Sequence, residues 1–129
     1  MSAWYLDTSA ALKLLVAEAE SAALVRTIQD EAPDLVACLL LETELRRAVP
    51  QLPAISHDHV TDLLDHVDVH DVPASLFREA GLLPGTHLRS LDALHLAAAT
   101  RIGVECLLTY DRLMGAAAHE IGVRVLAPA

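Results

Sequence analysis

The chain has 129 residues, of which 53% are hydrophobic and 21% are charged, and its formal net charge is −9. The length fits a single domain over residues 1–129, and the hydrophobic content excludes an intrinsically disordered chain. An acidic chain repels polyanions, which argues against a general nucleic-acid coat protein but allows an enzyme that binds one phosphate locally. No apolar run approaches the ~18–20 residues of a membrane span, and the N-terminal residues are unlike a secretory signal, so we expect a cytoplasmic protein without membrane contact.

Short apolar runs alternate with amphipathic ones along the whole chain. In order, the patterns predict a strand ending at Asp7, helices over 10–16 and 18–32, a strand over 33–38, a helix from 39 to about Pro50, a helix over 56–67, a strand over 67–72, a helix over 74–83, a loop over 83–90, a helix over 91–103, a strand over 104–110, a helix over 112–122 and a strand over 123–128. In the second helix, Leu24, Val25 and Ile28 are expected to face inward. This alternation predicts an α/β fold whose parallel sheet is covered on both faces, with right-handed crossovers.

Three aspartates fall where such a sheet binds ligands, which is outside the carboxyl ends of its strands. Asp7 ends the first strand, Asp92 opens a helix, and Asp111 follows the fourth strand. Helix capping also explains these positions, because aspartate is a favoured cap and gains about 0.3–1 kcal/mol from the helix dipole. Serine, threonine and asparagine cap nearly as well, however, so capping explains the positions better than the shared residue type.

The segment "LRSLDALHLAAA", residues 88–99, has hardly any polar face, so the helix is expected to be buried. A charge such as Asp92 in its first turn is costly at the rim of a core unless a positive group pairs with it. His95 is expected to be a hydrogen-bonded core or supporting histidine rather than a metal ligand, because oxygen-rich metal sites seldom include imidazole.

Helical phase identifies a fourth acid in "LLLETELRRAV". Glu44 shares the inward face with Leu41 and Leu45, whereas Glu42 stands four residues before Arg46 and indicates an exposed ion pair. The alternative for Glu44 is a partly buried acid satisfied by an arginine.

Four carboxylates within about 5 Å would repel by about 3 kcal/mol per pair at an effective dielectric near 20, so a cation must offset them. Oxygen ligands select Mg²⁺ or Mn²⁺, and the absence of clustered cysteines or of an H-E-x-x-H pattern argues against zinc. Cys38 and Cys106 are expected to be buried free thiols.

Four motifs in this order, "YLDTSAALK" at 5–13, "ETELRRA" at 42–48, "LRSLDALHLAAA" at 88–99 and "LLTYDRLM" at 107–114, resemble the PIN-domain ribonucleases, especially VapC-type toxins. The resemblance spans essentially the whole chain. It implies a three-layer α/β/α sandwich around a five-stranded parallel sheet, and Mg²⁺-dependent endonucleolytic cleavage of RNA by metal-activated water, with Mn²⁺ as a possible substitute. It further implies a homodimer and a cognate antitoxin protein that blocks the site.

Carried over by position, the family's catalytic and metal-binding acids fall on the four residues already singled out, namely Asp7, Glu44, Asp92 and Asp111. Thr8 or Ser9 would orient the first carboxylate, and Thr109 would assist near the last. Cys38 departs from the pattern, because many relatives carry serine there, and this puts in doubt a polar contact beside Glu44.

Arginines flank the acidic motifs and can bind RNA phosphates despite the acidic total; they are Arg46, Arg47, Arg89 and Arg112. Arg89 and Arg112 are the favoured pair. Plain surface solvation is the alternative for each of them.

Other classes of protein share single features of this sequence. The histidines of "HDHVTDLLDHVDVH", at 57, 59, 66 and 70, suggest a metal store or sensor, but the apolar positions of this helix leave them on a solvated outer face. A haloacid-dehalogenase-like phosphatase needs a second aspartate where Ser9 stands. Both this class and the phospho-receiver domains also need a lysine late in the sequence, and the only lysine here is Lys13. The remaining alternative is a catalytically degenerate PIN fold that serves as a binding or scaffold module.

Overall fold

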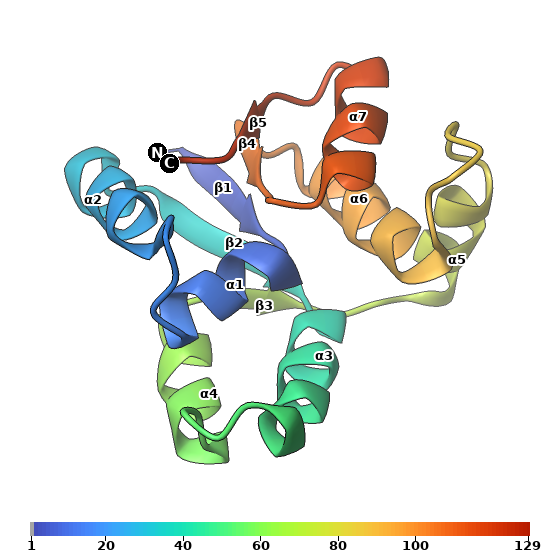
Figure 1. Cartoon of the computed structure of the whole chain (residues 1–129). Coiled ribbons are helices and arrows are strands. Elements are labelled where there is room, and N and C mark those ends of the chain that lie inside the picture. Colours follow the sequence, from blue (N-terminus) through green and yellow to red (C-terminus); the bar gives the residue numbers. More distant parts are fainter. Residues whose placement is uncertain (1) are drawn as a thin grey trace.

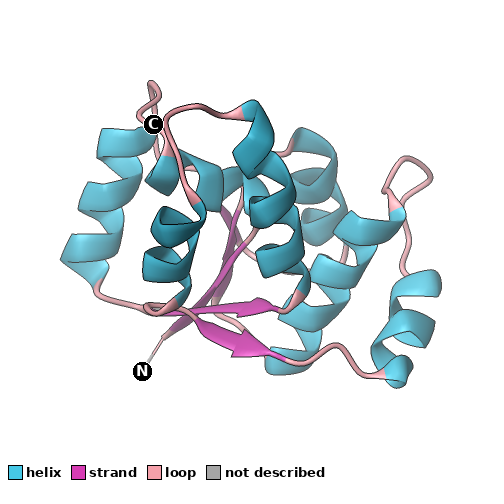
Figure 2. Ribbon diagram, turned by 90° about the horizontal axis from the view of Figure 1, so that it is seen from below, coloured by secondary structure: helices cyan, strands magenta, loops and turns pink. Residues whose placement is uncertain are grey.

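The computed structural model describes residues 2–129, in which a five-stranded parallel sheet lies between two layers of helices (Figures 1 and 2). The strands lie in the order β3-β2-β1-β4-β5. Their bounds are β1 Ala3–Leu6, β2 Asp34–Cys38, β3 Asp68–His70, β4 Cys106–Leu108 and β5 Val125–Leu126. The predicted α/β class, with its three layers and five parallel strands, is confirmed.

Seven α-helices cover the two faces of the sheet. On one face are α1 Thr8–Leu15, α2 Ser21–Glu31, α3 Leu40–Ala48, which a 3₁₀ turn extends, and α4 His57–Leu64; on the other are α5 Ala74–Gly81, α6 Ser90–Ile102 and α7 Arg112–Glu120 (Figure 1). The chain first runs outward from β1 to β3 and then returns past β1 to β4 and β5. Because parallel crossovers are right-handed, helices of the two runs lie on opposite faces. Within residues 2–129, no helix combines the length and the apolar character needed to cross a bilayer.

The core lies on both sides of the central strands, because helices cover both faces there. Tyr5, Leu6, Ala37, Leu107 and Leu108 are fully buried. Both cysteines are buried and free, as expected. Strands that are covered on both faces consist of nearly continuous apolar residues. The short apolar runs of the sequence therefore predicted the central strands.

One residue that was expected to face inward, and several element ends, differ from the prediction. Val25 is 38% exposed instead of facing inward, because the buried stripe of α2 runs through Leu24 and Ile28, and Val25 lies about 100° around the helix from Leu24. The α2 helix begins at Ser21, three residues later than position 18, and α4 ends at Leu64 rather than at 67. The last strand has only two residues. The differences in length lie at element ends, where boundaries are least sharply defined.

The topology sets the place of the functional site. The chain changes direction across the sheet between β1 and its neighbour β4, so the two connections leave on opposite faces. Open α/β sheets typically bind their ligands beyond the carboxyl ends of the strands at such a point. The backbone N–H of Asp7 donates to the carbonyl of Leu108 over 3.3 Å, which keeps the two strand ends side by side.

Candidate active site

The four predicted acids come from four different elements of the carboxyl edge. Asp7 directly follows β1, Asp111 precedes α7, Asp92 lies in the first turn of α6, and Glu44 lies on α3. Burial, and then the charges of Asp111, Glu44 and Asp7, raise the pKa of Asp92, although His95 acts in the opposite direction. The structure therefore brings the four carboxylates into one electrostatic environment.

Asp7 is the most tightly held of the four acids. Its side chain is buried, and Oδ1 accepts hydrogen bonds from the Ala10 backbone N–H at 2.9 Å and from the Ser9 hydroxyl at 2.7 Å. Oδ2 accepts the Thr109 hydroxyl at 2.5 Å. Burial raises the pKa of Asp7, and the hydrogen bonds from Thr109, Ala10 and Ser9 partly offset that rise. The expected orienting role of Ser9 toward this carboxylate is thus present in the geometry.

Asp111 is linked to Asp7 through Thr109. The backbone N–H of Asp111 donates to the Thr109 hydroxyl oxygen at 3.1 Å, while that hydroxyl donates to Asp7. Asp111 also caps α7, because its Oδ1 accepts the Met114 N–H at 3.0 Å. Capping therefore accounts for the positions of Asp7 and Asp111, as the sequence allowed, but each keeps a second carboxylate oxygen that does not serve the cap.

Glu44 is held by two side chains that approach the same oxygen. The Thr8 hydroxyl donates to Oε1 at 3.0 Å, and Nε2 of His95 contacts Oε1 as well. Of the two residues expected to orient Asp7, Ser9 donates to its carboxylate, whereas the hydroxyl of Thr8 reaches across to Glu44 on α3. The partner considered for Glu44 was an arginine, whereas the structure supplies a histidine.

Behind His95 lies a hydrogen-bonded network that the sequence reasoning missed. His95 is 1% exposed, and its Nδ1 lies 2.7 Å from the hydroxyl of Tyr5. The Tyr5 hydroxyl accepts the backbone N–H of Cys38 at 3.1 Å, and the Cys38 sulfur lies 3.7 Å from Nδ1. The expectation of a hydrogen-bonded core histidine is confirmed. The available signal was Tyr5 itself, because a buried tyrosine hydroxyl needs a polar partner.

Glu44 and His95 form an ion pair at neutral pH. Burial by itself would lower the pKa of His95, but the hydrogen bonds with Cys38 and Glu44 outweigh it and raise the pKa to about 10. Burial opposes ionisation of Glu44 too, yet the hydrogen bond and charge of His95 lower the pKa of this carboxyl. The pKa of the histidine rises and that of the glutamate falls, because each partner favours the charged form of the other.

Asp92 differs from the other three acids because no hydrogen bond within residues 2–129 holds its carboxylate. The N-cap of α6 is Arg89, and no ion pair to the Asp92 carboxylate is found in that part of the chain either. Its raised pKa reflects burial and like charges without a paired cation. An unpaired carboxylate among three other acids fits a hard divalent cation, which prefers oxygen ligands and relieves such repulsion.

The geometry does not, however, present a closed ligand shell. Across residues 2–129, no three His, Cys, Asp or Glu side chains form a group that is compact enough to hold a metal ion. In this geometry Asp7 is hydrogen-bonded to Ser9 and Thr109, and Glu44 contacts Thr8 and His95. The donor set suits Mg²⁺ or Mn²⁺, and metal ligation by the four acids stays a prediction.

The arginines beside the acids fall into two kinds. Arg46 is bound within its own layer, because it pairs with Glu42 at 2.7 Å and donates to Thr61 at 3.0 Å. This confirms the ion pair predicted on the outer face of α3. Arg89 and Arg112 are exposed, at the starts of α6 and α7, and form no ion pair within the described chain. Both guanidinium groups are therefore free to bind an anion at the carboxyl edge of the sheet. Arg47 is exposed as well.

The histidine-rich segment carries no comparable arrangement. His57, His59 and His66 are exposed, and His59 closes a capping box with Ser56 at the start of α4. His70 lies in β3 with Nε2 3.2 Å from Asp68. The predicted solvated outer face is confirmed for the three histidines of the α4 segment and is wrong for His70, which lies in β3 and is half-buried.

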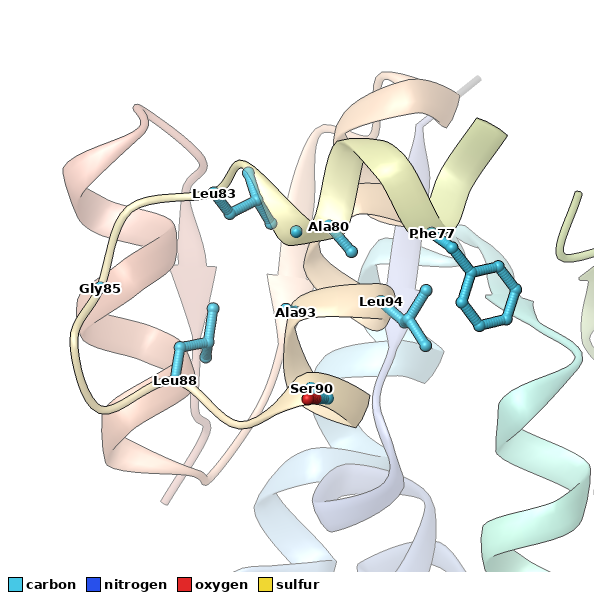
Figure 3. A pocket seen from close by; sticks show the side chains of 9 residues that line it. Phe77, Ala80, Leu83, Gly85, Leu88, Ser90, Ala93 and Leu94 are labelled. Carbon is cyan, nitrogen blue, oxygen red and sulfur yellow. The ribbon is translucent and has the colours of Figure 1, made fainter. Parts of the chain in front are cut away.

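A pocket of about 430 Å³ lies beside α6, between α5 and the loop that joins the two helices (Figure 3). Its lining includes Phe77, Leu83, Leu88, Ser90 and Leu94, and none of its lining residues is titratable. The pocket can therefore bind apolar groups but supplies no acid or base. The titratable groups at this edge of the sheet lie outside the pocket, among the four acids.

Comparison with known proteins agrees with this fold. The sequence matches the family described as PIN domain over residues 4–120. Ribonuclease VapC46 of Mycobacterium tuberculosis is 40% identical over 130 residues, covering 99% of each chain, and ribonuclease VapC35 of the same species is 35% identical, covering 96% of each. The chain therefore belongs to the PIN domain family, in the branch of ribonucleases named VapC.

Solved structures share the fold at low sequence identity. The crystal structure of Mycobacterium tuberculosis VapC20, described as a toxin that cleaves the sarcin-ricin loop, superposes with a TM-score of 0.73 at 18% identity, covering 88% of this chain and 94% of that one. A toxin–antitoxin complex from Klebsiella pneumoniae gives a TM-score of 0.73 at 17% identity and covers 97% of both chains.

Proposed function

We propose that this chain is a Mg²⁺-dependent endoribonuclease that acts in the cytoplasm as the toxin of a toxin–antitoxin pair. The observation that carries the proposal is the Asp92 carboxylate, which lies without a protein partner in the described chain among the charges of Asp111, Glu44 and Asp7. Relatives that are named ribonucleases and match along almost the whole chain support RNA as the substrate.

The four acids, Asp7, Glu44, Asp92 and Asp111, would hold the ion, with Mn²⁺ as a possible substitute. The chemistry that a bound divalent ion supplies is polarisation of the scissile phosphate and activation of a water molecule. The protein's own contribution is orientation: Ser9 and Thr109 fix Asp7, and Thr8 and His95 fix Glu44. Pre-set carboxylates need no reorganisation during the reaction, which is the main source of electrostatic catalysis.

Arg89 and Arg112 would bind the RNA backbone on either side of the acids. Both guanidinium groups are exposed at helix starts, where the helix dipoles also favour anions. This local binding explains how a chain of net charge −9 can act on a polyanion.

The experiment compares wild-type protein with Asp92→Asn on 5′-labelled RNA, in Mg²⁺, in Mn²⁺ and in EDTA. We expect cleavage in either metal, loss of cleavage in EDTA, and at least a hundredfold loss in the variant. Glu42→Gln is the matched control, since Glu42 is an acid of α3 that pairs with Arg46 on the outer face. Cleavage by a folded Asp92→Asn protein at the wild-type rate would overturn the proposal.

A second candidate function is a catalytically degenerate PIN module that binds or scaffolds RNA or protein. One observation favours it, because the described side chains form no compact metal-binding group. The same experiment separates the two functions: a degenerate module binds the labelled RNA but leaves it intact in both metals.

We further propose an antitoxin protein as partner and a homodimer as the assembly. The likeness of fold to chains solved in a toxin–antitoxin complex from Klebsiella pneumoniae and in VapBC2 from Rickettsia felis supports the antitoxin partner. The homodimer is what the family resemblance implies. Light scattering of the purified chain tests the dimer, and recovery of RNA cleavage when the co-purified partner is removed tests the inhibitor.

A further inference from the structure

The two side chains that hold Glu44 both contact one oxygen. Thr8 donates to Oε1 at 3.0 Å, and His95 contacts Oε1 through Nε2. Within residues 2–129, no hydrogen bond reaches Oε2. The carboxylate is therefore divided into an anchored oxygen and a second oxygen left without a protein partner.

The anchor on the His95 side is itself fixed from behind. The Tyr5 hydroxyl lies 2.7 Å from Nδ1, the two rings pack edge to face at 5.7 Å, and the Cys38 N–H fixes the hydroxyl. Tyr5 is fully buried in β1, and Cys38 ends β2. The position of His95 is thus set by groups of two neighbouring strands of the sheet.

The Glu44–His95 contact joins the two helical layers. Glu44 belongs to α3 on one face of the sheet and His95 to α6 on the other, and Asp92 lies one turn before His95 on the same helix. A free glutamate side chain samples many rotamers, and ordering them opposes metal binding. A contact that fixes Glu44 relative to α6 removes that cost before the metal arrives.

We propose that His95 and Tyr5 are positioning residues, which hold Glu44 by Oε1 and direct Oε2 to the metal ion. The inference rests on the proposed function, since it concerns the same acids. Hydrogen-bond partners of metal-binding carboxylates typically change metal affinity by about 10–100-fold when they are removed. Thr8 is the second anchor, on the opposite side of the sheet from α6.

The test measures Mn²⁺ binding to the full chain without RNA, by the electron paramagnetic resonance signal of free Mn²⁺. Tyr5→Phe removes only the hydroxyl behind His95, and His95→Asn withdraws the donor from Glu44. We expect both to weaken Mn²⁺ binding by about 10–100-fold. His95→Gln keeps an N–H donor near the Nε2 position and should recover part of this loss.

Thr100→Val is the matched control, because Thr100 is also on α6 and its hydroxyl bonds only to the helix carbonyl of Leu96. Thermal unfolding shows which variants are folded at the temperature of the assay. A purely structural network would lower the melting temperature of Tyr5→Phe but leave Mn²⁺ affinity unchanged in the folded protein, and this result would overturn the inference.

Measurements on wild-type protein and on the variants distinguish failure of the proposed function from failure of the positioning role. Wild-type protein that binds no Mn²⁺ would overturn the proposed metal-dependent function together with this inference. Wild-type protein that binds Mn²⁺, with folded Tyr5→Phe and His95→Asn variants that bind it equally well, would overturn only the positioning role. Because Tyr5→Phe removes a single hydroxyl, it decides the question even if His95→Asn fails to fold.

Discussion

The hydroxyl of Thr109 donates a 2.5 Å hydrogen bond to Oδ2 of Asp7 across 102 residues of sequence. It joins the end of β4 to the end of β1, and its oxygen also accepts the backbone N–H of Asp111 at 3.1 Å. One buried hydroxyl therefore fixes the relative position of two of the four acids.

Replacing Thr109 with valine keeps the shape of this side chain and removes its hydroxyl. Asp7 then loses a hydrogen bond that lowers its pKa, and the buried carboxylate and the Asp111 N–H are left without that partner. We expect urea denaturation to show a loss of about 1–3 kcal/mol in unfolding free energy, with slower RNA cleavage. Stability and cleavage equal to those of Thr100→Val would contradict the prediction.

The contacts of His95 with Cys38 and Glu44 make stability depend on pH at both ends. The pKa of His95 is raised from 6.5 to about 10, so its contribution is complete below pH 6.5 and is lost as the pH rises toward 10. The pKa of Glu44 is lowered from 4.5, so its contribution is present above pH 4.5 and is lost as the pH falls further. We expect the unfolding free energy to fall by on the order of a few kcal/mol on the alkaline side.

Urea unfolding of wild-type protein and His95→Gln from pH 6.5 to 9 measures that alkaline fall. Other groups titrate in the same range, and the variant subtracts them because it lacks only the imidazole. Two parallel curves would show that the pair does not contribute as described.

Neutralising Asp92 should separate stability from activity. Its pKa is raised by burial and by the charges of Asp111, Glu44 and Asp7, so its ionised form destabilises the folded state above its usual pKa. Asp92→Asn in EDTA should be as stable as wild type or more stable by up to about 1 kcal/mol, because the side chain is partly solvated. Calorimetry checks this, and a clear drop in melting temperature would oppose it.

Divalent ions should reverse that order of stabilities. A ligand that binds only the folded state stabilises it by mass action. Mg²⁺ at millimolar concentration should therefore raise the melting temperature of wild-type protein but not that of Asp92→Asn. Equal shifts in the two proteins would place the ion elsewhere.

Arg89→Ala and Arg112→Ala should weaken RNA binding with little effect on stability. Each side chain is exposed and forms no ion pair in the described chain, so we expect a change within about 0.5 kcal/mol. Loss of one phosphate contact reduces the slope of the logarithm of the binding constant against the logarithm of salt concentration by about one. Arg124→Ala is the control, since Arg124 precedes β5 at the opposite edge. An unchanged slope for both variants would remove these residues from the interface.

Sequence periodicity predicted the sheet and its layers, but it did not predict correctly which residues of α2 pack against the core. The central strands were predictable because residues such as Leu107 and Leu108 are apolar on both faces. Val25 was assigned to the wrong face of α2, because apolar character alone does not show which of two neighbouring positions meets the sheet.

The sequence by itself determined that acids stand at the ends of two parallel strands and at the start of a helix, because strands running in one direction must end at one edge. Only the tertiary structure decided how these acids are held. Thr8 reaches Glu44 across 36 residues, His95 reaches it across 51, and Tyr5 reaches His95 across 90. Helical and strand periods describe which way a side chain faces, but they carry no record of the distant partner that packing places opposite it.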